Sequence, residues 1–425
     1  MKELKPMHTD ILVVGHGASG LLAASALAKD NNVLVVGRGT TATSLSTGCI
    51  SYVRKDILRQ ERNRIDLGAL ALSVHPFNDI IERGSLSLEE ILPEVSRFFL
   101  RSLSDQGLEM TDDAFNFFDM LTNAGNIYSC SIAPYFTASG RLDRMQGQRM
   151  ALLGLEGFRD LDSRLVALMC ESRLEDIRVR AHQRRLRLAG RSGDMTCSEA
   201  SMAMRSLEAQ EEISSIISDL SEDNVAIPPL FDLHHLHRGM SALCARTGRN
   251  VFELVTPLSL PGQRLQQALV RSAINHGCRL FCDRVVTRLQ VEGARIVAAR
   301  IETPTRTQRV SFNSMILATG NLVGGGLILR GQEVIDPFSI FKVGRFGEIQ
   351  SLPEQTGYDT FMRSVVESGY LVTNEMRLID KDGKPFENAF GAGAALASFS
   401  FPTGVGLGGE LLTAWVAAKY AGEVS

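Results

Sequence analysis

Six residues near the amino terminus have the spacing of a phosphate-binding turn. Gly15-His16-Gly17-Ala18-Ser19-Gly20 follows the apolar run 11–14 and opens an alanine- and leucine-rich segment that extends to residue 29. In a strand–turn–helix unit, the first glycine permits a tight turn, the second lets the backbone approach a pyrophosphate, and the third lets the helix pack closely on the strand. The amino terminus of the helix then attracts the phosphate. The nucleotide contacts predicted here are Gly15, Gly17, Ala18, Ser19 and Gly20.

The second strand of this unit departs from the dinucleotide pattern. A dinucleotide site usually carries a carboxylate at the end of that strand, where it binds a ribose hydroxyl. After the apolar run 33–36 this position is Gly37, followed by Arg38 and Gly39, and residues 33–39 contain no carboxylate. Three interpretations stay open: the adenosine ribose is held differently, the cofactor is FMN without adenosine, or Arg38 faces the 2′-phosphate of NADP.

Three further segments supply small residues for close approach to a cofactor. Ala318, Thr319 and Gly320 end the apolar run 310–317, and small residues after a buried strand allow such an approach. Residues 388–393 and the glycine-rich turn 403–409 precede a helix predicted at 410–420. The positive end of that helix would stabilise a reduced flavin. In flavoproteins with this order of elements, the strand before the glycine turn ends in Ala-Gly-Asp. In this chain the residue at the aspartate position is Ala394. The predicted contacts in these segments, including the loop 43–52, are Ala318, Thr319, Gly320, Gly393, Gly406, Gly408, Ser46, Thr47 and Gly48. For the loop, a hydrogen-bonded cap without ligand contact is the alternative.

The elements that position these residues predict an α/β chain. The order strand, glycine turn, helix, strand is that of a parallel sheet. A helix is expected at 264–276, followed by strands at 285–289, 296–301 and 310–317. We therefore predict a Rossmann-like FAD/NAD(P)-binding flavoprotein fold with an inserted second domain. The flavin-binding domain is discontinuous, formed by 1–55 and 258–425, and the insertion 56–257 is expected to be a mostly helical substrate or partner domain.

Within the insertion, two segments are expected to be helical. Residues 198–223 contain few glycines and many Glu, Ala, Leu and Met residues, which favour helices. The arginines of 178–191 are expected on the solvated face of a helix, with a partner surface as the lesser alternative.

Composition excludes several classes of protein. The 425 residues have a formal net charge of −3, so no basic excess is present to bind nucleic acid. No signal peptide and no membrane-spanning apolar run is recognisable. The seven cysteines include no CxxC pair, which indicates neither a disulfide framework nor an iron–sulfur site, and a cytoplasmic setting is expected. Three histidines at 234–237, near Asp232, are expected to form a solvated turn or a substrate-contacting loop rather than a metal site.

Together these motifs resemble one family, the B subunit of anaerobic glycerol-3-phosphate dehydrogenase. The resemblance is carried by residues 15–20, 38–39, 46–48, 262–266, 317–320, 324–327, 373–377 and 388–393. It extends over about 10–54 and 258–422, with a fainter similarity near 152–161. The middle of the chain matches poorly, so substrate or partner specificity is expected there.

The resemblance implies a specific role. In that family the B subunit is a flavin protein that uses FMN, with FAD as the alternative here. It joins a catalytic FAD subunit to an iron–sulfur subunit that anchors the complex at the membrane. The complex oxidises glycerol 3-phosphate and passes electrons toward quinones. This implies a cytoplasmic protein, peripheral to the inner membrane through a partner.

Two other functions are compatible with the sequence. One is a self-sufficient flavin dehydrogenase or reductase of a small anionic substrate, resembling the fumarate reductase flavoproteins. The other is a non-enzymatic assembly module on the same fold. In the electron-relay interpretation the flavin performs the chemistry, so no catalytic acid or base is assigned.

Overall fold

The computed structural model describes residues 2–52, 88–111, 116–187, 195–322, 324–331, 333–344, 368–397 and 406–425. Two compact units make up the chain. Unit 1 contains Met1–Ala42, Ser51–Ser102 and Leu269–Ser425, and unit 2 contains Thr43–Ile50 and Leu103–Ala268. The predicted domain boundaries at 55/56 and 257/258 stay a prediction.

Unit 1 is built on a six-stranded sheet with the order β11-β4-β3-β15-β21-β20. Every neighbouring pair is parallel except β20 with β21. The strand bounds are β3 (Ile11–Val14), β4 (Val33–Val36), β11 (Arg279–Phe281), β15 (Ser314–Leu317), β20 (Arg377–Ile379) and β21 (Pro385–Gly391). A parallel sheet whose first strand leads through a glycine turn into a helix is Rossmann-like. The predicted fold class is therefore confirmed.

The central strands form because they are apolar at every position. All four residues of β3, β4 and β15 are buried, as expected for parallel strands that are covered on both faces. Their register pairs Ile11 with Val33 on one side and with Ser314 on the other. The carboxyl ends of these strands consequently lie at one edge of the sheet.

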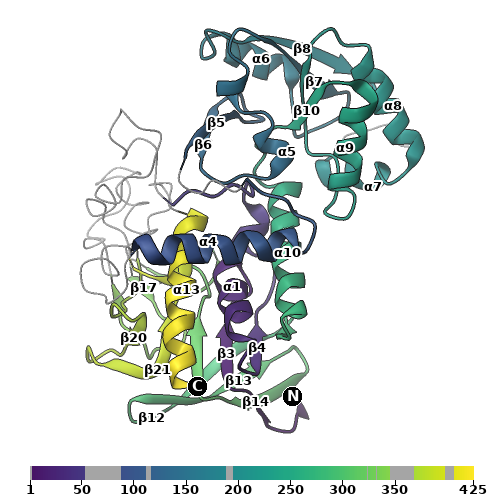
Figure 1. Ribbon diagram of the computed structural model, residues 1–425. Coiled ribbons are helices and arrows are strands. Elements are labelled where there is room, and N and C mark those ends of the chain that lie inside the picture. Colours follow the sequence, from purple (N-terminus) through teal and green to yellow (C-terminus); the bar gives the residue numbers. More distant parts are fainter. Residues whose placement is uncertain are drawn as a thin grey trace. The chain divides into compact units, whose positions relative to one another are not determined.

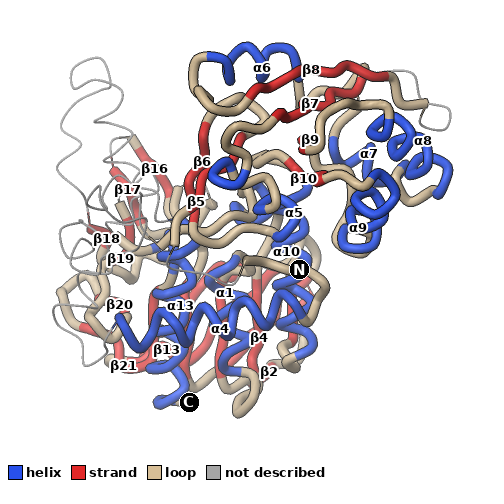
Figure 2. The backbone as a smooth tube through the Cα atoms, turned by 45° about the horizontal axis from the view of Figure 1, so that its top comes forward, coloured by secondary structure: helices blue, strands red, loops and turns tan. Residues whose placement is uncertain are grey.

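Two long helices of unit 1 pack together on this sheet. Helix α1 (Ala18–Leu27) follows β3, and α13 (Gly406–Val424) ends the chain. Helix α1 contacts β3 and β4, α13 contacts β15 and β21, and the two helices contact each other (Figures 1 and 2). Both helices contain small residues that are completely buried, such as Ala24 in α1 and Ala417 in α13.

A second sheet of unit 1 contains the strands predicted at 285–289 and 296–301, which pair as an antiparallel hairpin, together with their neighbours. Its strands are β1 (Lys2–Glu3), β2 (Met7–His8), β12 (Val285–Glu292), β13 (Arg295–Glu302) and β14 (Arg306–Ser311). The strand predicted at 310–317 is in fact two elements, because its first residues end β14 and its last four form β15 in the other sheet. The remaining elements of unit 1 are β16 (Ile328–Arg330), β17 (Glu333–Ile335), β18 (Val343–Gly344), β19 (Gly369–Tyr370) and η4 (Gly393–Ala395).

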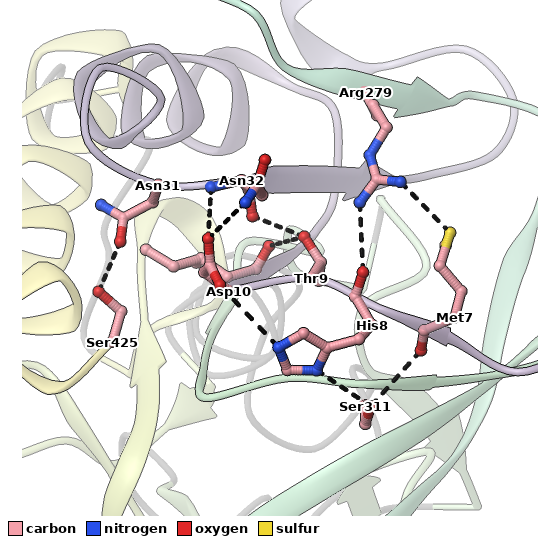
Figure 3. A network of polar contacts seen from close by, with 10 residues as sticks. Met7, His8, Thr9, Asp10, Asn31, Asn32, Arg279, Ser311 and Ser425 are labelled. Carbon is pink, nitrogen blue, oxygen red and sulfur yellow. Dashed lines mark hydrogen bonds and ion pairs between the residues drawn. The ribbon is translucent and has the colours of Figure 1, made fainter.

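A polar network closes the amino-terminal edge of the six-stranded sheet, where β3 and β4 begin (Figure 3). The carboxylate of Asp10 accepts hydrogen bonds from the backbone and side-chain nitrogens of Asn32, at 2.7 and 2.9 Å. The backbone bond from Asn32 is the main reason that the pKa of Asp10 lies below its usual value. Thr9 donates a 2.6 Å hydrogen bond to the Asn32 carbonyl. At the carboxyl terminus, Ser425 donates to the side chain of Asn31 at 2.7 Å.

Unit 2 contains a four-stranded parallel sheet with the order β10-β9-β7-β8, and the helices around it are visible in Figure 2. Its sheet strands are β7 (Arg149–Leu155), β8 (Arg178–Arg184), β9 (Asn224–Ile227) and β10 (Asn250–Glu253), and β5 (Phe118–Leu121) with β6 (Ile127–Cys130) forms a hairpin. The helical elements are η1 (Ala42–Leu45), α5 (Tyr135–Ala138), η3 (Leu142–Arg144), α6 (Ser163–Glu171), α7 (Cys197–Ala203), α8 (Leu207–Ser218) and α9 (Leu236–Thr247). The bounds of α4 (Leu88–Ser104) and α10 (Leu260–Asn275) include residues of both units.

The structure differs from the expectations for this region in three ways. Instead of a mostly helical domain, unit 2 has helices arranged with a parallel sheet. Residues 178–184 of the arginine-rich segment form the edge strand β8 instead of a helix, and Arg178, Arg180 and Arg184 are exposed in it, whereas residues 188–191 lie outside the described residues. The helix predicted at 198–223 is two helices, because Ser206 caps α8 by accepting a hydrogen bond from the backbone of Ala209.

A completely buried ion pair fixes the start of α10 inside unit 2. Arg264 is 1 % exposed, and its two terminal nitrogens donate to the carboxylate oxygens of Glu253 at 2.6 and 2.8 Å. The Nε atom of Arg264 donates to the carbonyl of Phe231 at 2.7 Å. This bidentate geometry satisfies the buried charges and ties α10 to β10.

Removing one partner of this pair should destabilise the protein strongly. We expect Arg264→Ala to lower the free energy of unfolding by about 3 to 5 kcal/mol, because the carboxylate of Glu253 would stay buried without a counter-charge. Arg300→Ala, which removes an exposed ion pair with Glu302, is the control and should cost about 1 kcal/mol or less. Urea unfolding of the two variants gives the comparison, and equal losses would contradict the structural role of Arg264.

Candidate functional site

The carboxyl ends of four strands of unit 1 bring most of the predicted cofactor contacts to one edge of the sheet. The hydrogen-bonded ladder continues beyond the strands, since Gly15 donates to Val36 at 2.8 Å and Ala318 donates to Val14 at 2.8 Å. Ala392, which precedes the predicted contact Gly393, extends the same ladder next to β15. The turn after β3, the small residues after β15 and the turn after β21 therefore lie side by side.

The glycines of the first turn are required by close backbone contacts. A Cβ atom at Gly15 would lie 2.0 Å from the carbonyl oxygen of Ala318, and the φ angle of Gly15 is +117°. A Cβ atom at Gly20 would lie 2.1 Å from the Gly15 carbonyl oxygen. Gly17 is the N-cap of α1, which has no side-chain cap hydrogen bond and no acidic residue in its first turn. This helix terminus is therefore suited to an anion.

Thr319 places a polar atom at the same edge. Its hydroxyl is buried and has no hydrogen-bond partner among the residues that the structure describes. The loop that follows folds back over it, because Gly326 donates to the Asn321 carbonyl at 3.0 Å and a Cβ atom at Gly326 would lie 2.5 Å from the Thr319 hydroxyl. Tyr370 holds this loop by donating to the carbonyl of Gly326 at 2.9 Å.

The turn after β21 packs directly on the start of α1. Gly393 has a φ angle of +72°, and a Cβ atom there would lie 2.1 Å from the Ser19 hydroxyl. The backbone nitrogen of Gly393 donates to the Thr413 hydroxyl at 2.9 Å, and Thr413 donates to the Gly409 carbonyl of α13 at 2.7 Å. Thr413 thus connects the turn to α13, a role that sequence reasoning missed.

Glu410 is a second residue that sequence reasoning missed. It lies near the start of α13, and its carboxyl group hydrogen-bonds Ser19. Burial raises the pKa of this carboxyl to about 7, and the hydrogen bond from Ser19 opposes that rise. Its signal in the sequence is weak, since it is a single acid after a glycine-rich turn.

The remaining predicted contacts are placed as follows. Arg38 and Gly39 are exposed beyond the end of β4, and Arg38 forms a backbone bridge with Asp283. Gly406 is the first residue of α13. A Cβ atom at Gly408 would lie 2.2 Å from the Ser51 carbonyl oxygen. Residues 403–405 of the predicted glycine turn lie outside the described residues.

Ser46, Thr47 and Gly48 belong to unit 2. Their loop is held by its own hydrogen bonds: Ser46 donates to the Thr43 carbonyl at 2.7 Å, and the backbone of Gly48 donates to the Ser46 hydroxyl at 3.2 Å. A Cβ atom at Gly262 would lie 2.5 Å from the Ser46 carbonyl oxygen. This is the capped loop that the sequence offered as an alternative, and the predicted contact of the loop with a flavin stays a prediction.

The described residues contain neither a metal-binding cluster nor a membrane-crossing helix. No group of three or more His, Cys, Asp or Glu side chains suited to a metal ion occurs among them. Within the same part of the chain, none of the helices is long and apolar enough to cross a membrane. The imidazole of His235 instead contacts the Asp232 carboxylate at 2.7 Å.

Comparison with known proteins supports the resemblance found in the motifs. No family model matches the sequence. Proteins named as the B subunit of anaerobic glycerol-3-phosphate dehydrogenase align with nearly the whole chain. The relative from Actinobacillus succinogenes is 22% identical and aligns over 99% of this chain and 100% of its own length. The relative from Pectobacterium atrosepticum is 24% identical over 96% of this chain and 97% of its own length. The resemblance to these B subunits is thus confirmed, and the alignments cover nearly the whole chain.

Solved structures give more distant likenesses. The open conformation of a flavocytochrome c3 fumarate reductase is 11% identical, with a TM-score of 0.44 over 98% of this chain and 79% of its own. A 3-ketosteroid delta1-dehydrogenase from Sterolibacterium denitrificans is 11% identical, with a TM-score of 0.42 over 98% of this chain and 100% of its own. Because both TM-scores are low, the fold assignment rests on the strand order and the glycine turn described above.

The raised pKa of Glu410 predicts a pH dependence of stability. The folded chain binds this proton more tightly than the unfolded chain, in which the pKa is near 4.5. The resulting stabilisation is complete below pH 4.5 and is lost as the pH rises to about 7. The Glu410→Gln variant should therefore lose less of its free energy of unfolding than the wild type as the pH rises. Glu423→Gln, at an exposed position of the same helix, is the matched control and should follow the wild type. Urea unfolding from pH 4.5 to 8 tests this, and identical profiles for wild type and Glu410→Gln would contradict it.

Proposed function

We propose that this protein is a flavin-binding subunit of an oxidoreductase and relays electrons, as its resemblance to the B subunits suggests. The observation that carries the proposal is the meeting of three features at one edge of the parallel sheet. These are the amino terminus of α1 with its glycine N-cap, the hydroxyl of Thr319, which has no partner among the described residues, and the turn at Gly393. A phosphate at α1 and a polar group of the same cofactor near Thr319 would satisfy both protein groups.

The residues at this edge fit a phosphate-bearing cofactor. The cradle is lined by glycine and alanine backbone, so a cofactor can approach the chain closely. In the proposed site Gly17, Ala18 and Ser19 hold the phosphate, and the Thr319 hydroxyl orients the cofactor. Gly406 and Gly408 lie in the first turn of α13, whose positive end would face the ring. A bound flavin accepts and returns one or two electrons, and the protein supplies its position and electrostatics.

The cofactor that we propose is FMN, with FAD as the alternative. Two positions that hold carboxylates in the dinucleotide flavoprotein pattern are Gly37 and Ala394 in this chain. A carboxylate at position 37 would bind the adenosine ribose of FAD. Because Gly37 has no carboxylate, the site lacks an attraction for adenosine, whereas its attraction for a riboflavin phosphate is unaffected.

The proposed partners follow from the names of the relatives, which describe the B subunit of an anaerobic glycerol-3-phosphate dehydrogenase. We propose that a catalytic FAD subunit delivers electrons from glycerol 3-phosphate. An iron–sulfur membrane-anchor subunit would carry them toward a quinone-linked acceptor. The protein would then be cytoplasmic and peripheral to the inner membrane through that partner. The predicted insertion 56–257 would supply substrate or partner contacts.

Identification of the bound flavin tests this proposal directly. The purified chain is expected to absorb visible light as a flavoprotein and to release FMN on denaturation, identified by chromatography. Released FAD would favour the self-sufficient dehydrogenase, especially if a small anionic substrate reduced the protein rapidly without partners. A colourless chain that neither flavin reconstitutes would refute the proposal. The non-enzymatic assembly module would then be the remaining interpretation.

The Thr319 hydroxyl offers a sharper test of the site. Thr319→Val keeps the side-chain shape but removes the hydroxyl, and we expect flavin affinity to fall about tenfold because a buried hydrogen bond to the cofactor is lost. Stability of the flavin-free chain should not fall, since this hydroxyl has no partner within the protein. Thr319→Ser keeps the hydroxyl and serves as the control. Unchanged flavin affinity in Thr319→Val, measured by fluorescence titration, would remove Thr319 from the site.

A further inference from the structure

The imidazole of His16 lies directly over the backbone of Gly37. A Cβ atom at Gly37 would lie 2.1 Å from Nδ1 of His16, 2.8 Å from its Cγ and 3.0 Å from its Cε1. The ring thus fills the space into which any side chain at position 37 would project. His16 is only 8% exposed, so this space is enclosed by protein and holds no room for a second group.

Two further contacts fix this arrangement. The imidazole hydrogen-bonds the backbone of Gly39, which favours its protonated form, but burial has the larger effect and lowers the pKa of His16 below its usual value. The backbone of Gly37 is itself bonded on both sides, because it donates to Phe281 at 2.9 Å and accepts from Arg284 at 3.1 Å. The end of β4 is therefore held from β11 on one side and capped by His16 on the other.

In dinucleotide-binding folds, the residue at the end of the second strand projects a carboxylate toward the adenosine ribose. The missing acid at position 37 and the presence of His16 are therefore one feature, since neither a carboxylate nor any other side chain fits at 37 while the imidazole is in place. Helix α1 begins two residues after His16, at Ala18.

We propose that His16 is a specificity-determining residue: it occupies the place of the side chain that would bind an adenosine ribose, and it thereby restricts this site to a mononucleotide. The proposal rests on the proposed function, because it assumes that the phosphate at α1 belongs to a bound nucleotide. It goes further by assigning the choice between FMN and FAD to a single pair of residues.

The steric coupling of His16 and Gly37 can be measured without any ligand. Gly37→Ala should lower the melting temperature of the chain, because its Cβ would meet the imidazole. The same substitution in a His16→Ala background should have little effect, since the space is then open. Equal losses in the two backgrounds would show that His16 does not fill this space and would overturn the proposal.

Nucleotide selectivity is the second test, with FMN, FAD and ADP as probes in calorimetric titrations. The wild type is expected to bind FMN at least tenfold more tightly than FAD and to bind ADP weakly. His16→Ala combined with Gly37→Glu opens the space and restores the ribose carboxylate, so it should gain at least tenfold in affinity for both FAD and ADP. Gly37→Glu alone is the matched control and should gain nothing, because the imidazole still blocks the position.

The outcomes separate this proposal from the proposed function. If the wild type binds neither flavin but the double variant gains affinity for ADP, the flavin proposal fails and the role of His16 stands. If wild type binds FAD as tightly as FMN, or a folded double variant gains neither FAD nor ADP, His16 does not exclude adenosine. Circular dichroism establishes that each variant is folded, and His16→Ala alone replaces the double variant if the latter is not. In that case, no gain in FAD or ADP affinity would equally refute the role of His16.

Discussion

The approach of the Gly15 backbone to the carbonyl of Ala318 is the contact on which the arrangement of unit 1 depends. A Cβ atom on residue 15 would lie only 2.0 Å from the carbonyl oxygen of Ala318. Strands β3 and β15 can therefore end side by side at this edge only with glycine at position 15. This alignment of the strand ends brings the start of α1 to the edge of the sheet and places the turn at Gly393 against Ser19. Packing of α1 on α13 follows from the same geometry, because both helices start beside this edge. The position of the α1 terminus, where we propose that a phosphate binds, is thus a consequence of strand packing.

Charge at this edge is distributed differently from the usual dinucleotide pattern. The positions that normally carry carboxylates are Gly37 and Ala394, whereas a carboxyl group enters from α13 as Glu410. Burial raises the pKa of Glu410 to about 7, so near neutral pH this group is protonated in a large fraction of molecules. A protonated carboxyl beside Ser19 adds little negative charge next to the helix terminus. The edge therefore stays favourable for a phosphate although it contains an acid.

Sequence patterns predicted the parts of the fold whose periodicity is simple. Strands at 11–14 and 33–36 were correct to the residue because strands buried on both faces are apolar throughout. Strand β8 was mistaken for a helix because its arginines suggested a solvated helix face, whereas the Arg178–Val179–Arg180–Ala181 alternation has the period of an edge strand. The partners in a parallel sheet are distant in sequence, so nothing local indicated the sheet of unit 2. The same limit applies to the site: the glycine turn was visible, but the contact of His16 with Gly37 and that of Glu410 with Ser19 exist only after folding.

The segments that resemble the B subunits serve two different purposes in this structure. The residues of the first glycine turn lie at the sheet edge where a cofactor is proposed. Others are structural, since Arg264 is buried against Glu253 in unit 2. Asn388 joins β21 to β13 through hydrogen bonds of 2.9 Å with the backbone of Ile296. A residue in a segment that resembles the B subunits is therefore not a cofactor contact on that ground alone. The distinction comes from partners: Asn388 and Arg264 have their hydrogen-bonding groups engaged within the protein, whereas the hydroxyl of Thr319 is buried with none. Unsatisfied polar atoms at a sheet edge are where a cofactor can contribute binding energy.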